Sequence, residues 1–456
     1  MRLVSLCLTA VVLGNLSSAH SNPDNSMINI PFEKYTLPNG LDVILHEDHS
    51  VPIVAVNIWY HVGAAREKAG RTGFAHLFEH LMYEGSQNVP DGVYDNIVDG
   101  SGGQNNGSTG FDRTNYWLVV PNNYVEPALW LESDRMGFLL PGITQERLDL
   151  QRDVVKNERR QNYENQPYGM SWVKIMEAMY PPDVPYNWLP IGSQEDLTAA
   201  SLQDVKDFFR TFYSPSNASL CIGGDFDPAE MKRLVAEYFS DVPAGPDVPR
   251  PKPVTQTLKE TKSLVLEDNV QLPRLYMFWH TPAAFQPDDA DLSIMAELLT
   301  NGKNSRLYKA LVYEKQIAQD VDAFQEGNEL SGFFGIIATA KPGHTLAELH
   351  QEIMAELKKL QTSAPSDREL QRAKNGIRSS FVYRLQTIGG FGGKTDQLNA
   401  YNIWLGDPGK FNDDLERYQK VSTSGIKRVA NAYFKGTGYV LLSIVPKGKL
   451  ELQARP

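Results

Sequence analysis

The chain repeats itself, and this repeat restricts the folds open to it more than any other feature. The segment "LHEDHSVPIVAVNIWYHVGAA" (residues 45–65) matches "LEDNVQLPRLYMFWHTPAA" (residues 266–284) in order: an acidic pair, a polar turn, a proline, an apolar strand and small residues. Residues 196–224 and 417–446 form a second matching pair, each running from a capped amphipathic helix through a short turn into an apolar strand. Two copies of one α+β unit account for both matches.

A proline-rich stretch separates the two copies. Residues 241–263 contain five prolines in a polar context, which is typical of a linker. We therefore expect a linker at residues 241–261, a first domain over residues 23–240 and a homologous second domain over residues 262–456. Strand patterns alternate with helical windows, and the turn "LPNG" favours antiparallel pairing. The sequence predicts an α+β fold of two homologous domains, each an antiparallel sheet with helices packed on one face.

The amino terminus predicts export. Residues 1–19 carry a basic residue, a short apolar run and small residues where a signal peptidase could cut, and no later window is long enough to span a membrane. Removal of Cys7 with this signal peptide leaves Cys221 alone, so neither an intrachain disulfide nor a cysteine metal site is expected, and Cys221 is predicted to lie in a buried strand. A formal charge of -11 without a long basic run excludes a nucleic-acid-binding protein.

The stretch "GFAHLFEHLMYEGS" (residues 73–86) combines an amphipathic helix pattern with metal-binding side chains. On a helix, His76, Glu79 and His80 share an arc about 100° wide. Two imidazoles at positions i and i+4 can bind one Zn²⁺, and the glutamate between them can reach a water at the metal. This H-x-x-E-H order is the reverse of the H-E-x-x-H zinc-protease motif. The alternative is a pair of half-exposed histidines without a metal.

A third ligand is expected on the helix that starts with Thr144 as its N-cap and ends before Pro167. Glu158 lies on the same stripe as the apolar positions of that helix, where a carboxylate needs a partner, and a metal is one. Spacing alone also allows Glu158 to be a solvated or ion-paired surface residue. Glu164 competes for the ligand role.

At these residues the chain resembles the pitrilysin or insulinase-like family of zinc metallopeptidases (peptidase family M16), in the branch of mitochondrial processing peptidase and its bacterial relatives. The resemblance is carried by "HLFEH", by "RDVVKNERRQNYENQPYG" and by "YPPDVPYNWLPIGSQEDL", and it extends over nearly the whole mature chain. It implies a metallopeptidase fold of the LuxS or processing-peptidase type. It also implies one zinc ion per chain held by His76, His80 and Glu158, with Glu79 as general base.

The resemblance further implies how a peptide would bind. "GGQNNGSTGFDRTNYWLVVP" (residues 102–121) looks like the family's edge strand, on which a substrate is added as a further strand, with Asn106, Gly107 and Ser108 near the scissile bond. Without the resemblance, a flexible glycine-rich loop is the simpler interpretation. Gln151 stands where many relatives carry a second glutamate, which puts a supporting role in charge or proton handling in doubt.

The second half has no histidine at the position of the zinc helix and is expected to be non-catalytic. The family's chamber needs four such units and this chain supplies two, so the resemblance implies a partner subunit: a heterodimer with a homologous non-catalytic chain, and a homodimer as the lesser alternative. Lys394 and Tyr401 occupy the positions of a substrate-binding arginine and tyrosine. The expected function is a zinc endopeptidase exported to a bacterial periplasm. The rival is a catalytically silent peptide-binding or scaffold subunit.

Overall fold

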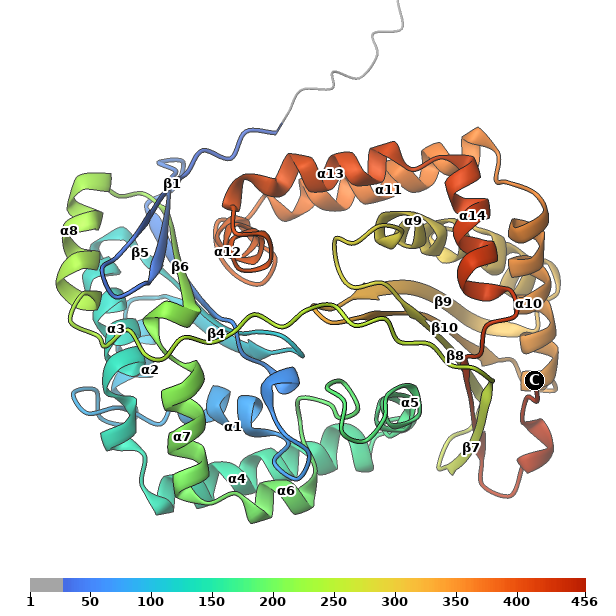
Figure 1. Ribbon diagram of the computed structural model, residues 1–456, viewed down its shortest axis with the longest axis horizontal. Helices are drawn as coiled ribbons and strands as arrows, with labels where there is room; N and C mark the ends of the chain where they lie inside the picture. Colours follow the sequence, from blue (N-terminus) through green and yellow to red (C-terminus); the bar gives the residue numbers. More distant parts are fainter. Residues whose placement is uncertain (1–27) are drawn as a thin grey trace, which may run out of the picture.

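Two sheet-plus-helix halves lie side by side in the computed structural model, which describes residues 28–456 (Figure 1). The expected α+β fold with two homologous units is confirmed. The signal peptide expected at residues 1–19 and Cys7 lie outside the described residues. In residues 28–456, no helix combines the length and apolar composition needed to cross a membrane.

The first half is a six-stranded sheet in the order β1-β2-β6-β3-β5-β4 with helices packed against it. Its elements are β1 (Glu33–Thr36), β2 (Asp42–Glu47), β3 (Ile53–Tyr60), α1 (Phe74–Leu81), α2 (Val93–Gly100), β4 (Gln104–Thr109), β5 (Thr114–Pro121), α3 (Val125–Gly142), α4 (Gln145–Arg159), α5 (Ser171–Met179), α6 (Gln194–Ala199), α7 (Leu202–Phe212), β6 (Ala218–Gly224) and α8 (Pro228–Phe239).

The second half is a five-stranded sheet in the order β7-β11-β8-β10-β9. Its elements are β7 (Lys262–Asp268), β8 (Arg274–Thr281), α9 (Asp289–Thr300), β9 (Ala318–Gly327), β10 (Gly332–Ala340), α10 (Leu346–Thr362), α11 (Asp367–Arg384), α12 (Lys394–Leu405), α13 (Phe411–Lys420), α14 (Thr423–Phe434) and β11 (Val440–Pro446). Without β1, the first sheet has the same strand order, so the sequence repeat corresponds to a repeat of topology.

Each sheet contains one parallel pair among antiparallel ones, a detail that the "LPNG" turn did not predict. β2 pairs with β6 in parallel, and β7 pairs with β11 in parallel, while the other neighbours are antiparallel. In both halves the parallel partner is the last strand of the unit in sequence, and it lies between the first two strands of the repeated pattern. A pairing of such long sequence separation leaves no local turn signal.

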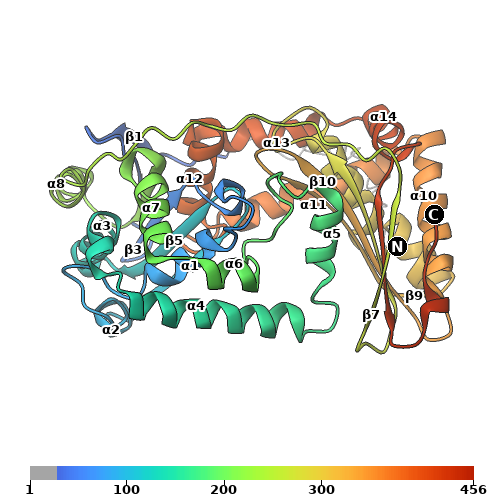
Figure 2. The same ribbon diagram turned by 60° about the horizontal axis from the view of Figure 1, so that its bottom comes forward.

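The halves exchange helices. Helix α12, from the second half of the sequence, packs against β6 and β3 of the first sheet, whereas α5, from the first half, packs against β11 and β8 of the second sheet (Figure 1). Figure 2 shows α5 beside the second sheet, beyond the end of α4. The domain boundaries drawn at the linker therefore stay a prediction, since each sheet is covered by a helix from the other segment.

The exchanged helix α12 buries the face of the first sheet that α1 leaves open. Leu398 of α12 packs with Ile44 and Cys221, and the predicted burial of Cys221 is confirmed. Asn399 of α12 donates to the backbone oxygen of Asn57 at 2.8 Å and accepts from the Ser219 hydroxyl at 2.7 Å. The face of this sheet opposite to α1 is thus covered by α12, a helix from the second half of the sequence.

Candidate metal centre

The apolar face of helix α1 packs into the core, so its polar face is directed away from the core. Phe74, Leu77, Phe78 and Leu81 are buried among the strands and α7, while His76 and His80 stay half-buried. The helix begins after Gly73, whose φ of +90° and close approach to Gly192 and Leu197 leave no room for a side chain. The start of α1 is therefore fixed by packing, and the histidines are held on the opposite side.

Helix α4 brings Glu158 to these histidines. Thr144 caps the helix by accepting a hydrogen bond from the Arg147 amide, as predicted, and Gln151 and Val155 lie buried on the same stripe as Glu158. The helix is regular to Arg159 and continues as a π-helical turn over Arg160–Glu164. It packs directly on α1.

The three expected ligands lie together. The Oε2 atom of Glu158 is 3.7 Å from His76 Nε2 and 3.4 Å from His80 Nε2, and one ligand atom from each residue lies within 4.8 Å of the others. A tetrahedral zinc ion with bonds of about 2.0–2.1 Å places its ligand atoms about 3.4 Å apart. The two distances from Glu158 are close to this spacing, and the chemistry of the donor set, two imidazoles and a carboxylate, fits zinc.

The protonation of this cluster also suits a metal. Burial, with the neighbouring His80 as a smaller cause, lowers the pKa of His76 to about 4, so its imidazole is neutral and can donate a lone pair. The contact with His80 lowers the pKa of Glu158 and keeps it a carboxylate. Glu164, the competing candidate, accepts from Arg159 Nε at 3.0 Å and from Gln194, so its carboxylate is engaged elsewhere.

Glu79 lies between the histidines and the sheet edge. Its Oε2 atom accepts a hydrogen bond from the Thr109 hydroxyl at 2.6 Å. Burial raises the pKa of Glu79, and the bond from Thr109 lowers it in part. A Cβ atom on Gly107 would stand 3.2 Å from Glu79 Cγ, so the edge strand lies directly against this carboxylate.

Strand β4 forms the free edge beside Glu79. It pairs with β5 on one side, with Gly107 opposite Tyr116 and Ser108 opposite Asn115. Because the Gly110 amide donates to Arg113 O in the connecting turn, alternation along the ladder directs the backbone groups of Asn105, Gly107 and Thr109 away from β5. The Gly107 amide donates to the side chain of its own neighbour, Asn106, at 2.8 Å. This strand offers backbone partners to an added strand next to the cluster.

Known proteins share this arrangement. The family model for insulinase (peptidase family M16) matches residues 42–180, and a model described as the peptidase M16 inactive domain matches residues 199–377. The chain belongs to peptidase family M16. It is 29% identical to zinc protease PqqE of Helicobacter pylori over 420 residues, covering 91% of this chain and 93% of that protein.

Two further M16 comparisons agree. A probable mitochondrial-processing peptidase subunit beta of Arabidopsis thaliana is 24% identical over 427 residues, covering 90% of this chain and 78% of that protein. The crystal structure of a protease from Helicobacter pylori superposes with a TM-score of 0.83 at 28% identity, covering 91% of this chain and 99% of that one. Both M16 halves are therefore present here, in the order of these relatives.

Two glutamates that the motif analysis did not single out support helix α1 and its surroundings. Glu67 is buried, and its two carboxyl oxygens accept from the Gly73 amide at 3.0 Å and the Ala75 amide at 2.8 Å, so it caps α1. Glu84 accepts from the buried Gln151 at 2.6 Å. Gln151 thus holds a neighbouring carboxylate in place. No sequence signal marked Glu67, because a glutamate six residues before a helix is common.

The second M16 half carries no equivalent centre. His76, His80 and Glu158 are the one group of three metal-ligating side chains found in residues 28–456. The corresponding edge strand, β9, is also partly closed: Thr300 of α9 accepts from the Ala323 amide at 3.0 Å and contacts Ala323 O at 3.4 Å. One half is thus built for binding at its edge and the other is capped.

Lys394 and Tyr401 are not brought to the metal centre. Both lie on α12, on the face of the first sheet opposite to α1. Lys394 forms an ion pair with Asp48 at 2.7 Å. Tyr401 is buried and donates its hydroxyl to Asp414 at 2.8 Å. Within residues 28–456 both side chains of the expected substrate-binding pair are thus engaged with residues of this chain, and a role in substrate binding stays a prediction.

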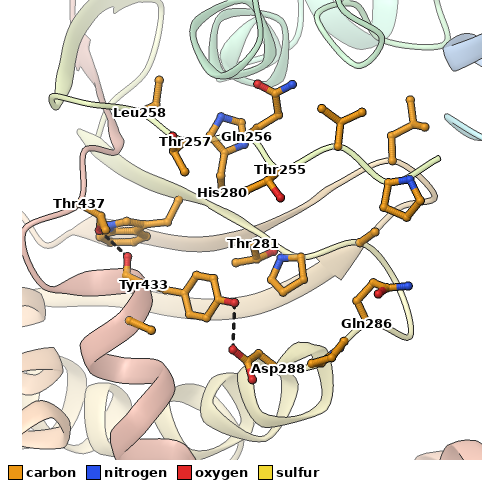
Figure 3. Close-up of a pocket in the computed structure, with 18 of the residues that line it drawn as sticks. Thr255, Gln256, Thr257, Leu258, His280, Thr281, Gln286, Asp288, Tyr433 and Thr437 are labelled. Carbon is orange, nitrogen blue, oxygen red and sulfur yellow. Dashed lines mark hydrogen bonds between the residues drawn. The ribbon is translucent and has the colours of Figure 1, made fainter.

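A separate cavity of about 430 Å³ lies between the linker and the second sheet (Figure 3). Its polar lining includes His280 at the end of β8 and Asp288, which accepts from the Tyr433 hydroxyl at 3.0 Å. His280 binds Met179 O of α5 through Nε2 at 2.9 Å. These residues tie the linker, α5 and the second sheet together and include none of the metal-centre residues.

Proposed function

We propose that this chain is a zinc-dependent endopeptidase in which His76, His80 and Glu158 hold the metal and Glu79 is the general base. The observation that carries the proposal is the convergence of three metal-ligating atoms within 4.8 Å of one another, beside Glu79 and a free sheet edge. Relatives named zinc proteases support the peptidase class.

Zinc at this centre would polarise the peptide carbonyl and acidify water. Glu79 takes a proton from the attacking water as the water oxygen bonds to the carbonyl carbon, and it returns this proton to the leaving amine as the C–N bond breaks. Thr109 binds one carboxylate oxygen, which leaves the other oxygen of Glu79 for the proton. His76 and His80 would hold the metal and take no part in the proton transfer.

The substrate would bind as an extra strand along β4. The backbone groups of Asn105, Gly107 and Thr109 would pair with it, and the Gly107 amide would exchange its bond to Asn106 for a peptide carbonyl. Asn106 and Ser108 point their side chains to the other face of the strand. Backbone pairing accepts many sequences, which suits peptides and unfolded segments.

The test compares four purified mature chains with zinc added: wild type, Glu79→Gln, His76→Ala and Glu164→Gln. Cleavage of internally quenched peptides and bound zinc per chain are measured together. We expect Glu79→Gln to keep zinc and lose nearly all turnover, and His76→Ala to lose both. Glu164→Gln is the matched control and should keep both. Parental turnover in Glu79→Gln would overturn the mechanism.

A partner chain and a periplasmic location complete the proposal. The chain supplies two M16 units, and a relative carries the name "subunit beta", which supports assembly with a homologous non-catalytic subunit, with a homodimer as the lesser alternative. Residues 1–19 support export. Activity of the isolated chain together with its mass in solution distinguishes the two assemblies. The alternative function, a silent peptide-binding subunit, is supported by Gln151 and by the inactive-domain match, and it predicts peptide binding without cleavage.

A further inference from the structure

One arginine beside the proposed substrate edge has no acidic partner. Arg113 lies in the turn between β4 and β5, directly before the first residue of β5. It is half-buried, and its guanidinium carbon lies 5.4 Å from the centre of the Trp59 ring. It forms no ion pair with any residue in the range 28–456. Asp396 and Glu79 attract its positive charge electrostatically, but neither carboxylate is in ion-pair contact with it. A cation withdrawn from water without a counter-charge is costly and needs a reason.

The arginine is held in one orientation. Its Nη1 group donates to the backbone oxygen of Ser108 at 2.7 Å, to the Ser108 hydroxyl and to Asn115 Oδ1 at 3.0 Å. Asn115 in turn donates to Asp396 of α12 at 3.0 Å. The Nε and Nη2 groups donate to no residue in the range 28–456 and are not completely buried. One edge of the fork is therefore fixed and the other is available to a ligand.

The alternation of side chains along the strands determines on which face of the sheet the Arg113 guanidinium lies. Ser108 and its cross-strand neighbour Asn115 lie on the α12 face of the sheet, whereas Gly107 and Thr109 meet Glu79 on the α1 face. Arg113 and Glu79 thus flank the same short stretch of β4 from opposite sides. A peptide added along β4 alternates its side chains in the same way. A residue next to the one facing Glu79 would point toward Arg113.

We infer that Arg113 forms a subsite for a carboxylate of the bound peptide, immediately beside the bond to be cut. The inference rests on the proposed function, because it needs a peptide on β4. A guanidinium fork binds a carboxylate through two parallel hydrogen bonds. The chain as a whole carries a charge of -11, so a carboxylate would be repelled without such a local cation. The carboxylate can belong to an aspartate or glutamate side chain or to the end of the peptide.

The experiment measures binding, so that it does not depend on cleavage. The Glu79→Gln chain with zinc is titrated into one fluorescent peptide series that places glutamate or glutamine at each position in turn, and into free-acid and amide forms of its carboxyl end. Preference for a glutamate position identifies a side chain as the source, and preference for the free acid identifies the terminus. We expect about tenfold tighter binding of the matching carboxylate, weakened by added salt.

Three further substitutions are added to the same Glu79→Gln chain. Arg113→Gln should bring the acid and amide forms to within about twofold of each other, and Arg113→Lys should keep part of the preference because it keeps the charge but not the fork. Arg210→Gln is the matched control, since Arg210 is an exposed arginine paired with Asp207 on α7. It should leave the preference unchanged.

Two results would overturn the subsite. One is a preference that survives in Arg113→Gln. The other is an equal loss of affinity for all peptides together with a lower melting temperature, because Arg113 would then only brace the β4–β5 turn. If no peptide binds to any variant, the proposed peptidase function fails and the subsite fails with it. Binding without any carboxylate preference removes the subsite alone.

Discussion

Replacing Glu67 by glutamine tests how the zinc helix is held. Glu67 is buried and its two oxygens accept from the amides of Gly73 and Ala75 at the start of α1. The glutamine in Glu67→Gln keeps one acceptor but turns an NH₂ group toward a backbone N–H. Loss of a helix cap costs about 0.5–2 kcal/mol, and a buried unpaired N–H adds about 1–3 kcal/mol. We expect a loss of about 2 kcal/mol at acid pH.

The effect of Glu67→Gln on the free energy of unfolding is expected to change sign with pH. Burial raises the pKa of Glu67 from 4.5 to about 8, more than the amide bonds lower it. In the folded chain the Glu67 carboxyl group then stays protonated up to about pH 8, whereas in the unfolded chain it releases its proton near pH 4.5. Stability from this group is present below pH 4.5 and is lost as the pH rises to about 8. The raised pKa corresponds to a loss of up to about 5 kcal/mol of wild-type stability as the pH rises. Glu67→Gln does not suffer this loss, because glutamine does not ionise.

The two stability curves should therefore cross. Urea denaturation between pH 5 and 9, run on zinc-free wild type and Glu67→Gln, should show the wild type more stable at pH 5 and the variant equal or better at pH 9. Glu195→Gln, at an exposed position in the first turn of α6, serves as the control and should follow the wild type. A variant that is less stable at every pH would refute the reasoning, because the carboxylate would then be ionised in the fold and cap α1 as an anion.

Other perturbations give outcomes of different kinds. Thr109→Val removes the bond to Glu79 and should lower kcat about tenfold or more with zinc content unchanged, whereas Thr109→Ser should retain most activity. Gly107→Val should block turnover through contact with Glu79 while the melting temperature changes little, checked by peptide cleavage and thermal unfolding. Removing zinc with a chelator should lower the melting temperature, since a ligand at about a hundredfold its Kd adds about 2.7 kcal/mol, and zinc should restore it. Asn399→Leu leaves the Ser219 hydroxyl without its acceptor and should cost about 2–4 kcal/mol in denaturant unfolding.

The features read correctly from the sequence are local or periodic. The H-x-x-E-H arc and the N-cap at Thr144 depend on residues within one or two turns, and the helix geometry fixes what they can do. The repeat also predicted that the two sheets share a strand order, because equivalent apolar strands pair in equivalent ways. The convergence of Glu158 with the histidines followed only with the help of the family resemblance.

The features that were missed depend on contacts between distant segments. The parallel insertion of β6 beside β2 and the packing of α12 on the first sheet join residues that are more than 150 positions apart. The spacing of Tyr401 from Lys394 also gave no sign that the Tyr401 hydroxyl donates to Asp414. Arg113 belongs to no motif that the sequence analysis recognised. Only the folded sheet shows that no carboxylate is in ion-pair contact with its charge.

The second half of the sequence contributes to the β4 edge through α12. Asp396 on that helix accepts from Trp59 Nε1 at 2.7 Å and from Asn115 at 3.0 Å, behind the strands that carry the edge. Asn115 also holds Arg113 against Ser108, so a chain of polar contacts runs from the second half of the sequence to β4. Because a strand that receives a substrate must keep its backbone in register, the second half would support peptide binding from behind β4, through α12.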